Sequence, residues 1–473
     1  MMLGQKAISR LAKAVAATAL AAQLLSGQGE RAVVARGGLM DPGVRGGPPG
    51  AGGPLSGLTQ DELQFFNDGL SQFNEVQVVT GGDNKGLGPR FNSNSCLACH
   101  SQPAPGGTSP AMNPAIAVAT LNGARNTIPW FITQNGPVRE ARFKRNPDGT
   151  NDGGVHDLFV ITGRSDAAGC NISQPTFTPA GNPLTGQGGN RNIIFRIPTP
   201  VFGAGLIENI PDSAILANVN AESSRKRASR IFGHPNAHLS GNVNRSANDG
   251  TITRFGWKAQ NKSLLLFAAE AYNVEMGVTN QIFPQERDET SGCVFNATPE
   301  DAPNFTATPN TAVFPDIDKF ANFMRMLAPP APAPATQSTT NGRAVFIRIG
   351  CDLCHTPSLM TGKMIASGSP TVPSVALSNQ TANLYSDLLV HHMGRNLEDG
   401  ITQGGAGPDE FRTAPLWGVG QRVFFLHDGR AKSLVDAIRA HRSPGSEANM
   451  VIDRFNRLRE REQQDIINFL RSL

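Results

Sequence analysis

Two short cysteine motifs carry the clearest chemistry in this chain of 473 residues. Cys96 and Cys99 are followed directly by His100, and the same C-x-x-C-H pattern returns at residues 351–355. Positions i, i+3 and i+4 of a helix share one face, so two thiols and one imidazole can meet a single macrocycle. This is the attachment sequence of c-type haem, in which two thioethers hold the ring and the histidine binds iron. We expect two covalently bound haem c groups, one on Cys96, Cys99 and His100 and the other on Cys351, Cys354 and His355.

The first residues predict export from the cytoplasm. A basic start with Lys6, Arg10 and Lys13 precedes an apolar run at 14–25, which is short for a bilayer span, and small residues follow. We expect a signal peptide at 1–28, a Gly/Pro-rich linker at 29–55, and a periplasmic or secreted protein without a stable membrane span after signal removal. An amphipathic helix or an uncleaved anchor are the alternatives.

Each cysteine motif taken singly also fits a thioredoxin-like redox pair or half of a zinc site. No second C-x-x-C lies close to either motif, and two such motifs behind an export signal favour haem. Cys170 and Cys293 remain as an even pair in an oxidising compartment. We expect a disulfide between them, with two separate thiols as the alternative.

The composition excludes some classes of protein and predicts a loop-rich fold. Charged residues make up 17% of the chain and the net charge is +4, without a Lys/Arg block, so no nucleic-acid partner is expected. The chain has 51 Gly and 34 Pro, which predicts much irregular structure between modest helices. The expected fold class is mainly α with much irregular loop and a few short β-hairpins, built as two cytochrome c-like haem domains.

Helical periodicity and breakers predict the domain organisation. A capping box at Thr59 and Glu62 starts a helix that precedes the first motif, and further helices are expected at about 263–272 and 316–327. A final helix presents Ile466, Phe469, Leu470 and Leu473 on one face. The Pro-rich run at 328–339 is the clearest boundary. We expect an N-terminal haem domain with long loop insertions at 56–327, a linker at 328–339 and a C-terminal haem domain at 340–473.

Several segments beyond the motifs resemble one known family. The chain is similar to the bacterial di-haem cytochrome c peroxidase superfamily, and within it to the branch called di-haem oxidoreductases or thiol oxidoreductases. The segments that carry the resemblance are GLGPRFNSNSCLACH (86–100), FRIPTPVFGAGLIENIPD (195–212), RFGWKAQ (254–260), AYNVEMGVTN (271–280), SDLLVHHMG (386–394) and FRTAPLWGVG through FLHDGR (411–430). Together they extend over most of the chain from residue 86 onward.

The resemblance implies two functional residues for the N-terminal haem. Trp257 matches the family's tryptophan between the haems, and Glu275 matches its catalytic glutamate before Met-Gly. An ordinary core tryptophan and a surface glutamate at a helix end are the plain alternatives. Where the peroxidases place a glutamine, this chain has Phe267, which departs from the family pattern. His156 and Met276 are candidate sixth ligands of this haem if it is closed.

For the C-terminal haem, the family's methionine ligand position corresponds to His441, 14 residues after His427. We therefore expect bis-histidine coordination by His355 and His441, with Met393 as the alternative and His427 in a supporting role. Arg254 and Arg395 are candidate partners for haem propionates.

The resemblance implies a periplasmic oxidoreductase of peroxidase type. It would reduce hydrogen peroxide or a related oxidant at the N-terminal haem. Electrons would reach that haem through the C-terminal haem from a small redox protein, a cytochrome c or a cupredoxin. Two alternatives stay open: a di-haem cytochrome that only transfers electrons, and oxygenase chemistry like that of the rubber-cleaving relatives, which an apolar distal pocket would favour.

Overall fold

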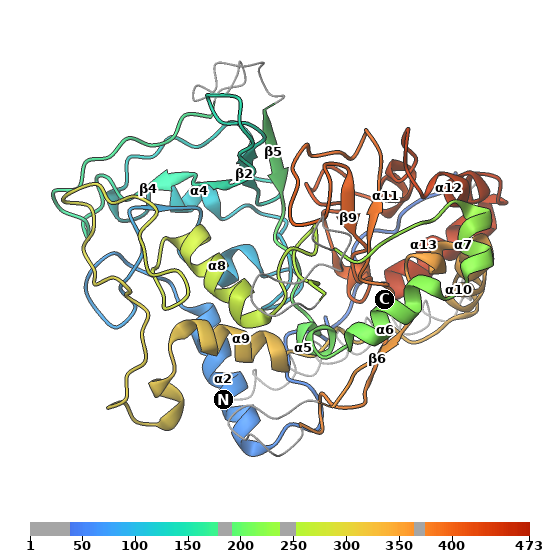
Figure 1. Ribbon diagram of the computed structural model, residues 1–473, viewed down its shortest axis with the longest axis horizontal. Helices are drawn as coiled ribbons and strands as arrows, with labels where there is room; N and C mark the ends of the chain where they lie inside the picture. The colour runs from blue at the N-terminus through green and yellow to red at the C-terminus, as the bar shows by residue number, and fades with distance from the viewer. Residues whose placement is uncertain (1–37, 178–191, 237–251, 364–373) are drawn as a thin grey trace, which may run out of the picture. The chain divides into compact units, whose positions relative to one another are not determined.

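Three helices gather around the first cysteine motif in the computed structural model, which describes residues 38–177, 192–236, 252–363 and 374–473 (Figure 1). They are α2 (Gln60–Asn74), α8 (Leu264–Met276) and α9 (Asp316–Met326). The predicted capping box starts α2, because the Glu62 amide donates to Thr59 Oγ1 and the Thr59 amide donates to the Glu62 carboxylate. The three helices predicted from periodicity in this part of the chain are therefore confirmed.

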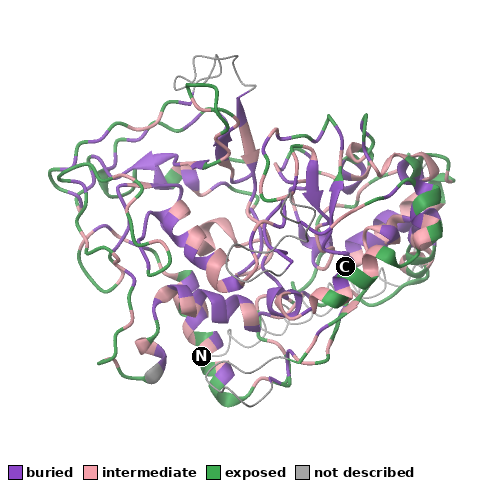
Figure 2. Ribbon diagram, in the orientation of Figure 1, coloured by how far each residue is buried: buried purple, intermediate pink, exposed green. Residues whose placement is uncertain are grey.

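The packing of α2 on α9 fixes the position of the first motif. The Phe323 ring of α9 lies 4.7 Å from Phe73 and 5.5 Å from Phe66, both on α2. Phe73 in turn makes an edge contact of 6.1 Å with the His100 ring. Figure 2 shows buried and half-buried residues along α8 and α9, as expected for helices inside a core. Burial of these phenylalanines therefore orients the imidazole that follows the motif.

A second group of helices surrounds the second motif. Helices α10 (Gln337–Ile349) and α13 (Glu460–Ser472) pack closely, since a Cβ added at Gly342 would lie 1.9 Å from the carbonyl oxygen of Asp465. The predicted apolar face of α13 is confirmed, because its four residues are all less than a tenth exposed. Phe346 of α10 contacts both Phe469 at 5.5 Å and His355 at 6.2 Å.

The remaining elements are short and separated by long irregular segments. The strands form small antiparallel sheets in the orders β1-β4, β3-β2-β5, β6-β7 and β8-β9. The fold is mainly α with irregular loops, as predicted, and β2-β3 is a short hairpin. The strands are β1 (Arg90–Phe91), β2 (Glu140–Phe143), β3 (Val155–His156), β4 (Phe159–Val160), β5 (Ile193–Arg196), β6 (Leu359–Met360), β7 (Thr381–Ala382), β8 (Val390–His392) and β9 (Glu410–Arg412). The other helices are α3 (Cys96–Cys99), α4 (Ala115–Val118), α5 (Ala204–Glu208), α6 (Asp212–Asn220), α7 (Ser223–Ser229), α11 (Leu434–Ala440) and α12 (Asn449–Asn456), with 3₁₀ turns at Leu121–Gly123, Asn310–Val313, Cys351–Leu353 and Val419–Gln421.

Residues Leu39–Leu473 form one compact unit. The Pro-rich run stays irregular until α10 begins at Gln337 and is tied to the body, because Ala333 donates to the carbonyl of Ser472. The division into two haem domains at 328–339 stays a prediction. The expected signal peptide at 1–28 lies outside the described residues. None of the helices in the described ranges has the length and apolarity needed to cross a membrane.

The predicted disulfide between Cys170 and Cys293 is confirmed. Their Cα atoms are 4.7 Å apart and both residues are buried. The bond links the loop after β4 to the segment after α8, across 123 residues of sequence.

Removing this disulfide will destabilise the protein. A cross-link across so long a segment limits the unfolded chain, and loss of a native disulfide typically costs about 2–4 kcal/mol. We expect the Cys170→Ser/Cys293→Ser double variant to lose about this much free energy of unfolding in urea titrations. The wild-type protein treated with a reductant is the matched comparison, and an unchanged midpoint in both would contradict the expectation.

Candidate functional site

The first motif presents its histidine in a form that can bind a metal. Cys96 and Cys99 lie at the two ends of α3, and His100 follows it. The His100 Nδ1 atom lies 2.9 Å from the carbonyl oxygen of Gly107, so Nδ1 carries the hydrogen and Nε2 keeps a free lone pair. Burial lowers the pKa of His100 to about 4, so the ring is neutral at pH 7.

The second motif repeats this arrangement with different partners. The His355 Nδ1 atom lies 3.0 Å from the carbonyl oxygen of Tyr385, which leaves Nε2 available. Burial lowers the pKa of His355 to about 4 as well. Two unrelated loops therefore hold the two motif histidines in the same tautomer.

A cavity opens beside each motif. The N-terminal cavity has an empty volume of about 1340 Å³ and is lined by all three residues of the first motif. The C-terminal cavity has an empty volume of about 1440 Å³ and is lined by all three residues of the second motif. Two thiols, a neutral imidazole and an adjoining cavity are the parts that a covalently attached haem requires, so the residues present fit that group at both places.

One face of α8 forms a wall of the N-terminal cavity. Phe267, Glu270, Ala271, Val274 and Glu275 line it at helical spacing. This face combines an apolar ring with two carboxyl groups. Phe267, the residue expected at the family's glutamine position, lies on this wall, and its correspondence to that glutamine stays a prediction.

Glu275 lies against a second carboxyl group, that of Glu140. Asn92 accepts from the Leu158 amide and donates from Nδ2 to Glu275 Oε2 at 2.9 Å. Burial and the neighbouring Glu140 carboxylate, to which Glu275 is hydrogen-bonded, raise the pKa of Glu275 well above its usual value. Burial alone would raise the pKa of Glu140 too, but the charges of Arg142 and Arg196 outweigh it and lower that pKa. Of the two carboxyl groups, Glu275 therefore holds a proton more strongly than Glu140 does.

Sequence reasoning missed Glu140 and Arg142. They lie on β2, and they reach the cavity because β2 pairs with β5, which leads into a segment that also lines it. No local pattern marks an alternating strand residue as the partner of a helix residue more than a hundred positions away.

Trp257 lies between the two cavities. Its side chain lines both of them and also a third, smaller cavity of about 550 Å³. The indole is buried, and Nε1 donates to the carbonyl oxygen of Ile197 at 2.9 Å, which fixes the ring. The expected role of Trp257 between two haems stays a prediction.

Both candidate sixth ligands and the predicted supporting residue His427 lie at the C-terminal cavity. His441, Met393 and His427 all line it, together with His355. The His441 Nδ1 atom lies 2.7 Å from the carbonyl oxygen of Ala437 in α11, so its Nε2 is available, and burial lowers its pKa. His427 instead stacks on Phe411 with a centroid distance of 4.2 Å. His441 thus has the same tautomer as the two motif histidines.

Two buried arginines are candidate partners for carboxylates at these cavities. Arg412 and Arg422 line the C-terminal cavity and the third cavity, and burial lowers the pKa of each to about 10. Within the described residues, Arg422 Nε and Nη2 have no hydrogen-bond partner. Buried donors of this kind suit an anionic group such as a haem propionate.

The arginines predicted from the sequence for this role lie elsewhere. The Arg254 guanidinium binds the carbonyl oxygens of Ile252 and Ile210 and the Asp212 carboxylate, and Arg395 is exposed. Of the two further ligand candidates, Met276 lines the N-terminal cavity. His156 pairs with Asp152 at 2.7 Å and is not among the residues that line the cavity.

Comparison with known proteins gives a family match. A family model described as "Di-haem oxidoreductase, putative peroxidase" matches residues 189–473. No curated protein matches the chain.

Several solved structures are similar at low identity. A hydrazine synthase of Kuenenia stuttgartiensis is 14% identical, covers 94% of this chain and 100% of its own, and has a TM-score of 0.35. The diheme peroxidase BthA from Burkholderia thailandensis is 16% identical over 58% of this chain and 86% of its own, with a TM-score of 0.28. A MauG-like protein associated with microbial copper homeostasis is 14% identical over 53% of this chain and 88% of its own, with a TM-score of 0.25. Scores this low carry no inference about fold or function.

The raised pKa of Glu275 predicts a specific pH dependence of stability. Above the usual carboxyl pKa the unfolded chain releases the proton that folded Glu275 keeps, so the free energy of unfolding falls as pH rises, by about 1.4 kcal/mol for each pH unit up to the raised pKa. We expect Glu275→Gln to remove this contribution, which urea titrations between pH 5 and 8 will measure. Glu289→Gln, at an exposed position in the segment after α8, is the matched comparison outside the pair. Parallel curves for wild type and Glu275→Gln would contradict the assignment.

Proposed function

We propose that this protein reduces peroxide in the periplasm. The chain belongs to the di-haem oxidoreductase family and is an enzyme of the di-haem peroxidase-like type, and this membership is the starting point of the proposal. Hydrogen peroxide or a related small oxidant would bind in the N-terminal cavity. Electrons would come from a small redox protein, a cytochrome c or a cupredoxin, by way of the C-terminal site. The overall change is H₂O₂ + 2H⁺ + 2e⁻ → 2H₂O.

The cofactor assignment rests on the two motifs and their cavities. Cys96 and Cys99 would form thioethers to one haem c and Cys351 and Cys354 to the other, with His100 and His355 as the iron ligands. When bound, the two haems supply the electron-transfer chemistry and the iron at which the oxidant reacts. The free Nε2 lone pairs of both histidines support this assignment.

The pair of Glu275 and Glu140 on the wall of the N-terminal cavity is the observation that carries the proposal. Cleavage of an O–O bond needs a proton to leave one oxygen and arrive at the other, and a carboxyl group with a raised pKa can do both. Burial and the Glu140 carboxylate raise the pKa of Glu275, while the ion pair with Arg142 lowers that of Glu140. This polar wall favours peroxide reduction over oxygenase chemistry. Only the apolar side chain of Phe267 favours an oxygenase.

Trp257 is proposed as the electron path between the two sites. Its ring touches both cavities, so an electron crossing from one to the other passes through one aromatic side chain rather than through a gap. The hydrogen bond from Nε1 to Ile197 keeps the ring in place.

Stopped-flow absorption spectroscopy of the reduced protein tests the function. We expect peroxide to oxidise the wild-type haems quickly, and Glu275→Gln to slow that step by about 10²–10⁴-fold, since that is the usual contribution of a positioned acid–base group. Glu270→Gln, a change on the same wall outside the carboxyl pair, is the matched control. Absence of any haem oxidation by peroxide, with both irons six-coordinate and unreactive to carbon monoxide, would support electron transfer alone. A stable oxygen adduct at the N-terminal site would support an oxygenase.

The proposed ligand His441 can be tested through a reduction potential. Methionine raises the potential of a haem relative to a second histidine, so we expect His441→Met to raise that of the C-terminal haem by on the order of 100 mV in redox titrations. Met393→Leu is the matched control in the same cavity and should leave the potential unchanged. A shift in Met393→Leu with none in His441→Met would identify Met393 as the ligand.

A further inference from the structure

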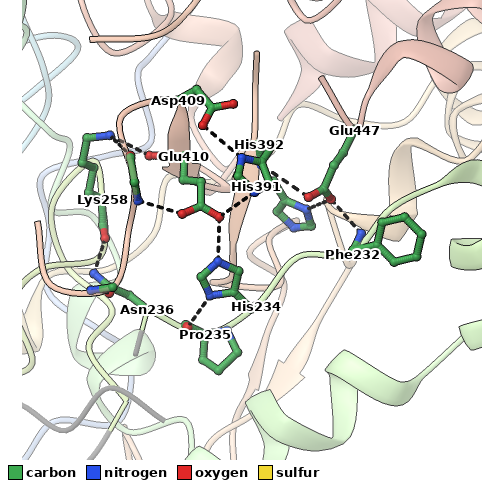
Figure 3. Close-up of polar contacts among 12 residues, drawn as sticks. Phe232, His234, Pro235, Asn236, Lys258, His391, His392, Asp409, Glu410 and Glu447 are labelled. Atoms are coloured by element: carbon green, nitrogen blue, oxygen red, sulfur yellow. Dashed lines mark hydrogen bonds and ion pairs between the residues drawn. The ribbon is translucent and has the colours of Figure 1, made fainter. Parts of the chain in front are cut away.

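Two imidazoles and two carboxylates meet on the β8-β9 sheet, beside the C-terminal cavity but not among the residues that line it (Figure 3). The side chains belong to His234, His392, Asp409 and Glu410. The two histidine side chains are 42% and 52% exposed, so small solutes can reach the group from solvent. Nothing in the proposed peroxidase function uses these residues.

The register of the sheet places three of these side chains on one face. His392 of β8 is directly opposite Glu410 of β9. His234 forms an antiparallel bridge to Val390, two positions before His392 on β8. Paired residues, and residues two apart on a strand, point to the same face of a sheet. His391 points to the opposite face, where it lines the C-terminal cavity.

Each imidazole is held by its Nδ1 atom and turns its Nε2 atom to the same oxygen. His392 Nδ1 lies 2.9 Å from Asp409 Oδ1, and His234 Nδ1 lies 2.9 Å from the carbonyl oxygen of Pro235. Glu410 Oε1 is 2.6 Å from His234 Nε2 and 3.2 Å from His392 Nε2. Figure 3 shows the Glu410 side chain between the two rings.

This arrangement needs a positive charge between the rings and the carboxylate. A carbonyl oxygen only accepts hydrogen bonds, so Nδ1 of His234 carries the hydrogen and the neutral ring has a lone pair at Nε2. The Asp409 carboxylate likewise accepts from His392 Nδ1, so the neutral His392 ring also has its lone pair at Nε2. Two lone pairs that face an ionised carboxylate repel it, unless protons or one cation lie between them. A divalent ion that replaced those protons would take both Nε2 atoms and Glu410 Oε1 as ligands.

The backbone around Glu410 is held rigidly. The buried Lys258 ammonium binds the carbonyl oxygens of Gly407 at 2.7 Å and Glu410 at 2.9 Å, and the Gly407 amide donates to Glu410 Oε2 at 2.7 Å. One carboxylate oxygen is thus fixed by the backbone, while Oε1 faces the two imidazoles.

We propose that His234, His392 and Glu410 bind one divalent first-row transition-metal ion, with zinc or copper as the favoured ions. Two imidazole nitrogens and one carboxylate oxygen are a common ligand set for these ions. Asp409 and the Pro235 carbonyl are the outer partners that metal-bound histidines ordinarily have. As the ion binds, Glu410 Oε1 yields the central position and the two exposed rings close on the metal.

The bound ion would join three segments that are distant in sequence. It would tie the loop after α7 to β8 and β9, whose other side forms part of the C-terminal cavity. Among the described residues, the ligand atoms of Cys354, Asp387 and His391 already lie within 4.8 Å of one another, whereas the proposed site closes only when its two rings move onto the ion. Cys354 is committed to the second motif, so that group belongs to the haem site and not to a further metal site.

Isothermal titration of the chelator-treated, haem-loaded full chain with Zn²⁺ or Cu²⁺ alone tests this proposal. We expect one equivalent to bind, and His392→Gln and His234→Gln each to weaken the affinity at least about tenfold. Glu410→Gln should weaken it too, since the amide oxygen still accepts from Gly407 while the charge is lost. His156→Gln, which breaks a His–Asp pair on β3, is the matched control and should bind as wild type does.

Zinc-edge X-ray absorption supplies a second measurement that is independent of peroxide activity. We expect two imidazole nitrogens and oxygen in the zinc shell, and unchanged haem absorption in the variants to show that they fold. The proposal is overturned if the His234→Gln/His392→Gln double variant binds the ion as tightly as wild type. It is equally overturned if wild type binds no equivalent, or if the zinc shell holds sulfur or oxygen alone.

Discussion

A histidine can bind iron only if the correct nitrogen is free of its hydrogen, and two loops of this protein meet that condition in the same way. The carbonyl of Gly107 takes the Nδ1 hydrogen of His100, and the carbonyl of Tyr385 takes that of His355. Burial then keeps both rings neutral. The irregular segment after each motif therefore has a definite role, because it brings a backbone carbonyl oxygen back to the histidine of that motif.

The local parts of this arrangement could be predicted from the sequence. The C-x-x-C-H spacing, the capping box at Thr59 and the apolar face of α13 each depend on residues a few positions apart. The Cys170–Cys293 bond could be predicted for a different reason, since the other four cysteines already had a role. Patterns of this kind can be read from the sequence because local helix geometry alone determines which residues come together.

The polar chemistry could not be predicted in the same way, because it depends on contacts between distant segments. Glu140 reaches Glu275 only through the pairing of β2 with β5. Arg254 was predicted to serve a cavity and instead binds backbone carbonyls near α5 and α6, while Arg412 and Arg422 take the cavity positions. A buried arginine looks alike in sequence whether it supports a backbone or faces a ligand. Only the fold separates the two.

Arg422 has a consequence for the stability of the protein. Its guanidinium lies 6.0 Å from the Trp257 ring with two donor atoms unpaired, and a cation without a counter-ion is costly to bury. A haem propionate at this position would supply the missing negative charge, so the prosthetic group would lower the cost of burying this cation as well as carry electrons.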